Sequence, residues 1–254
     1  MNFLISIAFV IWLYMTIAFL YALIRKDNSV VDIFWGPGFI VVAAYSLIVT
    51  GNLNPQTIVL NLLVCLWGLR LAVHIYLRNR GKGEDFRYKA WRDTWKFFIL
   101  RSYFQIFMLQ GIFMFIIASP VYFVNRHSSG SFHVNDYIGI ILFITGFWFE
   151  TMGDYQLTKF KRHPENKGKI ITTGLWSITR HPNYFGETLL WWGIGLFPLS
   201  YYQGWIMLIS PVMITLLLRF VSGVPMLEKK YRDHPQWDDY KQGTAAFVPF
   251  VRFL

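Results

Sequence analysis

The chain has 254 residues, of which 55% are hydrophobic and only 15% are charged, with a net charge of +10. Soluble domains average about 25% charged residues, so this composition excludes an ordinary soluble domain. The positive charge does not point to nucleic acid, because the chain has no zinc-finger spacing, basic helix or base-stacking motif. Membrane proteins collect Lys and Arg in their cytoplasmic loops, and we expect a membrane protein here.

Seven apolar stretches approach the ~20 residues that a helix needs to cross a bilayer. The hydrophobic pattern predicts spans, in chain order, at about 3–24, 30–50, 56–77, 104–124, 135–157, 185–200 and 204–222. The first stretch lacks a basic leader and a small-residue cleavage site, so we expect it to be retained as a helix. The sequence therefore predicts an all-α polytopic membrane protein of about seven transmembrane helices, with cytosolic loops that bind a cofactor.

The distribution of basic residues predicts the orientation of these spans. Most Lys and Arg side chains fall in segments 78–103 and 158–182 and in the tail near Lys229. With seven spans these segments share one side, and the loops on the other side contain a single basic residue, Arg126. The positive-inside rule then predicts an N-terminus outside the membrane and a C-terminus in the cytoplasm.

Polar side chains occupy the cytosolic halves of several expected spans, where an unpaired charge is costly. Those at helical spacing or near a span's cytosolic end are Asp32, Arg70, His74, Glu150, Asp154, Asn183, Glu187 and Arg219. Interhelical ion pairs or snorkelling arginines would account for single members of this set. Since all of them lie toward one side, a polar cavity that opens to the cytoplasm explains the whole set better.

The loops that face this cavity are basic and aromatic, which suits a cofactor that carries phosphate. Lys and Arg bind phosphate through charge-assisted hydrogen bonds, and a helix start such as Asn183 offers backbone N–H groups to an anion. The chain has neither a GxGxxG run after a strand nor a Walker loop, so a soluble nucleotide-binding module is not expected. The six histidines lack metal-ligand spacing, and we expect no metal.

Four runs in the C-terminal half carry a family resemblance: DYQLTKFK from Asp154, NKGKI from Asn166, GLWSITRHPNYFGE from Gly174 and EKKYRDHP from Glu228. Together with Arg219 and the apolar end FVPFVRF, they resemble the steroid 5α-reductase and sterol reductase superfamily. The match is best to an uncharacterised prokaryotic membrane branch, of the domain-of-unknown-function type. It covers roughly residues 150–254 well and implies an enzyme of the bacterial inner membrane.

The resemblance implies NADPH as the cofactor. It places Asn183 and Glu187 at the nicotinamide carboxamide, and near the ribose and phosphates it places Asp154, Lys161, Lys169 and Arg219. From their place in the motif we add as cofactor-binding candidates Arg180, His181 and Tyr184. We accordingly expect one membrane domain over 1–254, in which 135–254 binds the cofactor and 1–125 forms the substrate side.

The implied reaction is hydride transfer to an activated C=C bond of a lipophilic substrate, either steroid-like or another lipid, that enters from the membrane. The animal steroid enzymes polarise a ketone with a Glu on the second helix and a Tyr directly after a His on the third. Here Ile75 follows His74 and the second span has no Glu, so the acid is not the same. Our candidates for the acid are Asp32, His74, Tyr76 and Tyr88.

Other interpretations stay open at this point. Membrane methyltransferases that act on isoprenylcysteine or phospholipids share the RHPxYxG signature and would bind S-adenosylmethionine, although they carry paired Glu residues where this chain has Leu227 and Glu228. A transporter would concentrate its polar residues near the midplane of the bilayer. The charged, aromatic segment 81–91 would form either a lid over the cofactor or an amphipathic surface loop.

Overall fold

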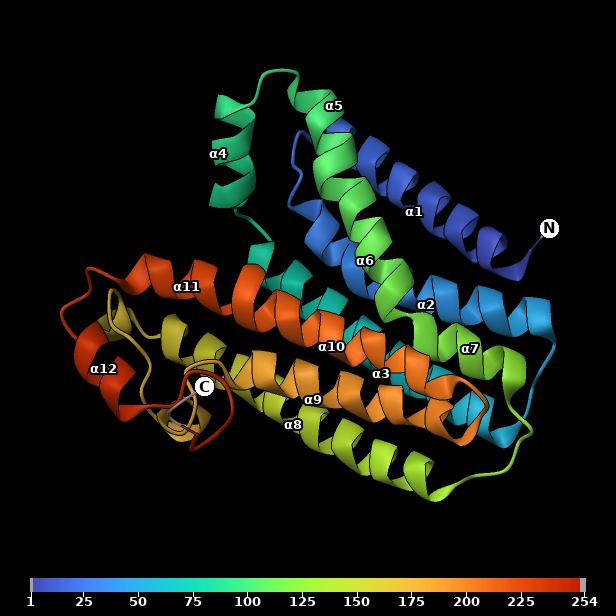
Figure 1. The fold of residues 1–254 in the computed structure, drawn as a ribbon. Helices are drawn as coiled ribbons and strands as arrows, with labels where there is room; N and C mark the ends of the chain where they lie inside the picture. The colour runs from blue at the N-terminus through green and yellow to red at the C-terminus, as the bar shows by residue number, and fades with distance from the viewer. Residues whose placement is uncertain (1, 252–254) are drawn as a thin grey trace. The chain divides into compact units, whose positions relative to one another are not determined.

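Helices form most of the computed structural model, which describes residues 2–251 (Figure 1). Within these residues the strand-like pairing is limited to one isolated bridge between Thr179 and Ala245. The expected all-α class is therefore confirmed. Arg252 and Phe253, at the end of the apolar run noted above, lie outside the described residues.

The chain forms two compact units, Met1–Phe132 and His133–Leu254. The division falls between the stretch expected to face the substrate and the stretch expected to bind the cofactor. That these form one membrane domain, with those two roles, stays a prediction.

Five helical stretches are long and apolar enough to cross a membrane: Phe3–Arg25, Val30–Thr50, Pro55–Asn79, Phe98–Ile117 and Gly204–Lys229. The first three agree closely with the expected spans. The expected spans at 135–157 and 185–200 are helical but are not among these five. The first of them contains acidic side chains, and the second is shorter than the ~20 residues of a full crossing. Seven crossings therefore stay a prediction.

The fourth expected span, 104–124, has the wrong bounds. The membrane-length stretch comprises α5 (Phe98–Ser102), a π-helical turn (Tyr103–Met108) and α6 (Leu109–Ile117). The following residues form a separate helix, α7 (Ser119–His127), with Pro120 in its first turn. Since proline has no backbone N–H, it favours a new helix start here over continuation of the preceding one.

Unit 1 is arranged around α2 (Val30–Thr50), which contacts α1 (Phe3–Arg25), α3 (Pro55–Asn79), α6 and α7. Its core contains large aromatic side chains; Phe39 of α2 meets Trp67 of α3 edge to face, with ring centroids 5.3 Å apart, and both are fully buried. The short helix α4 (Phe86–Thr94) follows α3 (Figure 1), and its buried Tyr88 packs in one cluster with residues of α1 and α2.

Unit 2 is built on an antiparallel pair, α8 (Val134–Arg162) and α9 (Pro182–Leu196). Glycines let the two backbones touch; a Cβ added to Gly146 would lie 2.5 Å from the Gly186 oxygen, and one added to Gly193 would lie 2.4 Å from the Gly139 oxygen. Small residues at such positions allow helices to approach closely in the absence of a solvent-driven core. The α8–α9 pair therefore has a fixed register.

The rest of unit 2 comprises α10 (Ile209–Leu216), a π-helical turn (Leu217–Val221), α11 (Val224–Tyr231) and α12 (Trp237–Gly243). In Figure 1, α10 runs beside α9, and α12 lies with the C-terminal tail near the start of α9.

The C-terminal tail packs against the loop that precedes α9. The Tyr240 hydroxyl donates to the Trp176 carbonyl at 2.6 Å, and the Thr179 hydroxyl donates to the Phe247 carbonyl at 2.8 Å. These bonds join residues more than 60 positions apart in the sequence. They lie at the end of unit 2 where α8 ends and α9 begins, the end that contains Asp154 and Asn183.

Candidate functional site

Acidic side chains are buried at one end of the α8–α9 pair. Glu150 and Asp154 lie one turn apart on α8, and Glu187 lies on the first turns of α9. The helices approach closely here because Gly153 has no side chain; an added Cβ would lie 3.1 Å from the Asn183 nitrogen. The short distance brings the Asn183 amide within 3.1 Å of Asp154, to whose Oδ1 its Nδ2 donates.

The hydrogen bond to Asp154 fixes which way the Asn183 amide faces. A carboxylate accepts hydrogen bonds, so the NH₂ group must point to Asp154 and the oxygen away from it. That oxygen, Asn183 Oδ1, is buried and has no hydrogen-bond partner among residues 2–251. A buried acceptor without a partner is costly, and it therefore marks a position where a ligand donor would be stabilised.

A second cluster joins the start of α9 to α11. The Arg180 guanidinium contacts Glu228 Oε1 through Nε and Nη2, each at 2.8 Å. Its Nη1 donates to the carbonyls of Lys241 and Thr244 in the tail. Both side chains of this ion pair are largely buried. Because most of its donors bind protein groups, Arg180 holds the tail and α11 against the start of α9.

His181 belongs to the same cluster. Its Nε2 lies 3.3 Å from Glu228 Oε1, and its ring stacks on Tyr184 with centroids 5.7 Å apart. Burial lowers the pKa of His181; hydrogen bonding to Glu228 opposes this effect, and the positive charges of Arg180 and Arg219 add to it. The neutral imidazole is thus favoured, with Nε2–H donating to Glu228 and Nδ1 left as an acceptor. Nδ1 is buried and has no hydrogen-bond partner among the described residues.

The expected phosphate-binding side chains occupy different surroundings. Lys161 is exposed in the last turn of α8, and Lys169 is exposed in the loop that follows. Arg219 is half-buried in the π-helical turn, with its guanidinium carbon 5.1 Å from the Phe220 ring centroid. The structure thus joins Asp154 with Asn183 directly, and electrostatically couples Arg219 to His181.

All four candidates for the catalytic acid lie in unit 1, and two of them, Asp32 and Tyr88, are in direct contact. The Tyr88 hydroxyl donates to Asp32 Oδ1 at 2.7 Å, and Arg87 binds the other oxygen of Asp32 at 2.9 Å. His74 is half-buried on α3 and Tyr76 is 51% exposed there, and neither takes part in the Asp32–Tyr88 hydrogen bond. Burial raises the pKa of Tyr88 well above its usual value, and the charge of Asp32 adds to the effect. Tyr88 is consequently protonated at neutral pH.

Acidic residues anchor the segment around α4 to the start of α2. Glu84 accepts the backbone N–H of Asn28 at 2.8 Å and binds Arg92 at 2.7 Å. Burial acts to raise the pKa of Glu84, but the hydrogen bonds from Arg92 and Asn28 outweigh it and the pKa is lowered. Asp85 caps the first turn of α4 by accepting from the Arg87 nitrogen. Glu84 therefore attaches this segment to the start of α2, and Asp85 stabilises α4 itself.

The sequence interpretation missed two residues of these clusters. Glu228 entered it only as a point of comparison with methyltransferases, although a single acid near the end of a long apolar stretch is itself a signal. Arg87 was one of several basic residues in a charged segment, and nothing local distinguished it. Among residues 2–251 the structure contains no group of three His, Cys, Asp or Glu side chains placed to hold a metal ion.

Comparison with known proteins gives a family. The family described as "Protein of unknown function (DUF1295)" matches residues 18–244. An uncharacterized protein of Schizosaccharomyces pombe is 28% identical over 56% of this chain and 48% of its own length. A steroid 5-alpha-reductase of Gossypium hirsutum is 26% identical over 44% of this chain and 41% of its own.

A third relative belongs to a different enzyme class. A probable O-methyltransferase of Ustilaginoidea virens is 39% identical over 27% of this chain and 24% of its own length. The chain thus aligns with less than half of each of these three relatives. No solved structure matches it.

Proposed function

The chain belongs to the family "Protein of unknown function (DUF1295)", within the steroid 5α-reductase-like superfamily, and on this premise we propose that it is an NADPH-dependent membrane reductase. Its reaction would be hydride transfer to an activated C=C bond of a lipophilic substrate, either steroid-like or another lipid. The similarity to a steroid 5-alpha-reductase supports a reductase of this general kind. We place its N-terminus outside and its C-terminus in the cytoplasm of a bacterial inner membrane, with seven crossings.

The observation that carries the proposal is the Asp154–Asn183 hydrogen bond with its buried, unpartnered Asn183 Oδ1. When bound, NADPH supplies the hydride. The nicotinamide carboxamide ends in an NH₂ group, which suits an amide oxygen held in a fixed direction. Glu187 lies one turn further along α9 and provides a second acceptor on the same face. Asp154 orients Asn183 before any ligand arrives, which lowers the cost of binding.

The remaining cofactor candidates divide into two roles. Lys161, Lys169 and Arg219 would bind the ribose and phosphates through charge-assisted hydrogen bonds. Arg180, His181 and Tyr184 instead form the wall at the start of α9, because Arg180 is bound to Glu228 and His181 stacks on Tyr184. We therefore propose that Arg180 positions this wall and does not itself touch phosphate.

Asp32, His74, Tyr76 and Tyr88 stay our candidates for the group that polarises or protonates the substrate. Tyr88 is protonated at neutral pH and is bound to Asp32. The Tyr88 proton is directed at Asp32 and its pKa is raised, so this hydrogen bond gives the pair no advantage as proton donor over His74 or Tyr76.

The alternative is an S-adenosylmethionine-dependent membrane methyltransferase of the isoprenylcysteine or phospholipid type. One observation favours it: one of the relatives described above, 39% identical over 71 residues, is a probable O-methyltransferase. The acid that such enzymes need in this region would be Glu228, which here is bound to Arg180 and His181.

Thermal unfolding of the purified full chain in detergent, followed by Trp fluorescence, tests both functions. NADPH at about 100 times its Kd would stabilise the folded protein by about 2.7 kcal/mol, and S-adenosylmethionine would have no effect. Asn183→Ala should abolish the NADPH shift, and Glu187→Gln, which loses the charge and one of two acceptor oxygens, should reduce it. Glu165→Gln, at an exposed position after α8, is the matched control and should keep it.

Each contrary outcome decides against part of the proposal. A higher unfolding temperature with S-adenosylmethionine but not with NADPH would favour the methyltransferase function over the reductase. Stabilisation by neither compound would exclude both cofactors. If NADPH stabilised Glu187→Gln and Asn183→Ala as strongly as the unchanged protein, the cofactor would bind elsewhere.

A further inference from the structure

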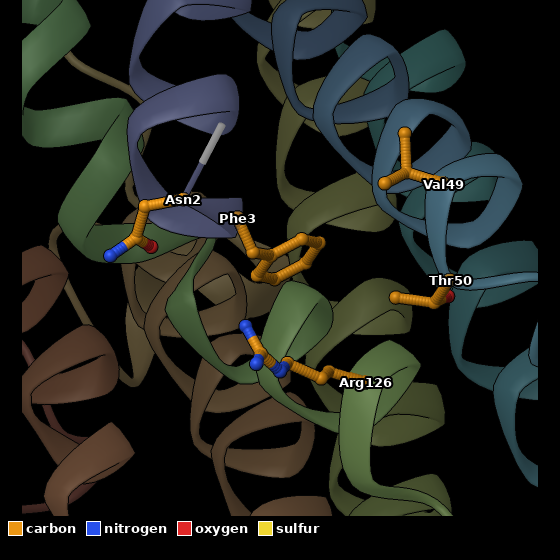
Figure 2. A pocket seen from close by; sticks show the side chains of 5 residues that line it. All are labelled: Asn2, Phe3, Val49, Thr50 and Arg126. Atoms are coloured by element: carbon orange, nitrogen blue, oxygen red, sulfur yellow. The ribbon is translucent and has the colours of Figure 1, made fainter.

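A pocket of about 500 Å³ opens at the end of unit 1 that is remote from Asp32 (Figure 2). It is lined by the start of α1, the last residues of α2 and the last turn of α7, through Asn2, Phe3, Val49, Thr50 and Arg126. Asp32 and Thr50 lie at opposite ends of α2, which at 1.5 Å per residue separates them by about 27 Å. This pocket is therefore separate from the Asp32–Tyr88 pair.

Arg126 is the only charged residue among the five that line the pocket. Its guanidinium carbon lies 5.1 Å from the Phe3 ring centroid, and Figure 2 shows the two side chains together. Stacking occupies the face of the guanidinium and leaves its N–H edge available. Arg126 forms no hydrogen bond or ion pair with any other residue in the described part of the chain.

The other polar side chains of the pocket are bound within their own helices. The Asn2 side chain accepts the Leu4 N–H at the start of α1, and the Thr50 hydroxyl donates to the Ser46 carbonyl. None of the five described residues that line the pocket is acidic. The pocket thus presents one oriented cation and no competing anion, which suits a ligand with a negative charge.

Exposed apolar side chains lie close in sequence to residues that line the pocket. Leu4 and Ile5 of α1 are about half exposed, and Ile48 of α2 is 78% exposed. Both helices are apolar and long enough to cross a membrane, so these side chains lie where acyl chains would cover them. A ligand that fits both features has an anionic head and an apolar tail.

We propose that this pocket binds the phosphate head group of an anionic phospholipid. Arg126, held over Phe3, donates charge-assisted hydrogen bonds to the phosphate, and the acyl chains lie along the exposed faces of α1 and α2. Basic pockets at the ends of transmembrane helices are a physically favourable place for lipid head groups, because charge and apolar contact act together. The site is independent of the proposed reductase activity.

Lipid retention by the purified full chain tests the proposal. The protein in detergent is titrated with phosphatidylglycerol, and bound lipid is counted by native mass spectrometry. Loss of a charge-assisted hydrogen bond of about 1.5–3 kcal/mol predicts that Arg126→Gln weakens binding at least roughly tenfold. Phe3→Leu, which keeps the charge and removes the ring, should weaken it less.

Arg101→Gln is the matched control. Arg101 is also exposed and also lies over an aromatic ring, with its guanidinium carbon 5.9 Å from the Trp95 centroid, but it does not line this pocket. This variant should bind phosphatidylglycerol like the unchanged protein. Each variant's thermal midpoint without lipid shows whether it is folded.

Three results would overturn the proposal. Equal affinity in folded Arg126→Gln and in the unchanged protein would remove Arg126 from the site. Equal losses in Arg126→Gln and Arg101→Gln would mean that lipid responds to the overall charge. Displacement of the lipid by millimolar inorganic phosphate would identify a site for a free anion.

Discussion

Replacing Gly146 by alanine should destabilise the α8–α9 pair. The added Cβ would lie 2.5 Å from both the Gly186 oxygen and the Leu190 nitrogen, whereas ordinary contact begins at 3.4 Å. The helices must therefore separate by about 0.9 Å, since both clashing atoms belong to the backbone and neither can rotate away. The same movement would lengthen the Asp154–Asn183 hydrogen bond two turns further along the pair.

The expected magnitude follows from two opposing effects. Overpacking a close contact costs about 1–3 kcal/mol, toward the upper part of that range when only backbone atoms can move. The greater helix propensity of alanine raises the free energy of unfolding by about 0.5–1 kcal/mol. The net loss of unfolding free energy should be about 2 kcal/mol, or roughly 4–8 °C in Tm for a chain of this size.

The assay is thermal unfolding in detergent at a fixed scan rate, read by Trp fluorescence. Gly243→Ala is the control, because a Cβ added there meets no atom within 4 Å and the residue ends α12 without a positive φ. It should unfold at the temperature of the unchanged protein or slightly above. An unchanged Tm in Gly146→Ala, or an equal decrease of Tm in Gly243→Ala, would refute the proposed steric clash between α8 and α9.

Three further outcomes are expected. Glu228→Gln should lower the unfolding free energy by about 3 kcal/mol, which is the low end for a buried ion pair because Glu228 is 19% exposed. An unchanged Tm would show that the Arg180–Glu228 ion pair does not hold α11 in place. Burial lowers the pKa of His181 below 6.5, so unfolding favours proton uptake and stability should fall as the pH drops below about 6.5. His181→Gln should flatten this dependence, and an unchanged pH profile would exclude His181 as its source. Tyr88→Phe removes a hydrogen bond to the Asp32 carboxylate of about 1.5–3 kcal/mol and should speed tryptic cleavage within α4. Equal cleavage rates would show that the Tyr88–Asp32 hydrogen bond does not anchor α4.

Much of the fold could be predicted because helix formation and apolar length are local properties. The first three expected spans agree with α1, α2 and α3 to within two residues. The fourth failed at its ends, because one apolar run contains two helices joined near Pro120. The sequence also supplied the spacing of Glu150, Asp154, Asn183 and Glu187, since residues four apart share a helix face.

The partners of these side chains could not be predicted in the same way. Asp32 binds Arg87 and Tyr88 more than 50 positions away, and Arg180 binds Glu228 after 48 positions. Hydrophobic periodicity carries no information about which distant side chains will meet. For Arg180 the difference matters most, because its motif suggested a cofactor ligand, whereas its contacts hold the tail in place.

The amino-acid sequence alone determined that this chain is helical, rich in membrane-length apolar segments, and polar along particular helix faces. Each of these properties depends on residues within a few turns of one another. Only the tertiary structure decided that Asn183 turns its oxygen away from Asp154 and that Arg126 stacks on Phe3 beside a pocket. Such choices depend on the distance between packed backbones, which glycines such as Gly146 and Gly153 set to within an ångström.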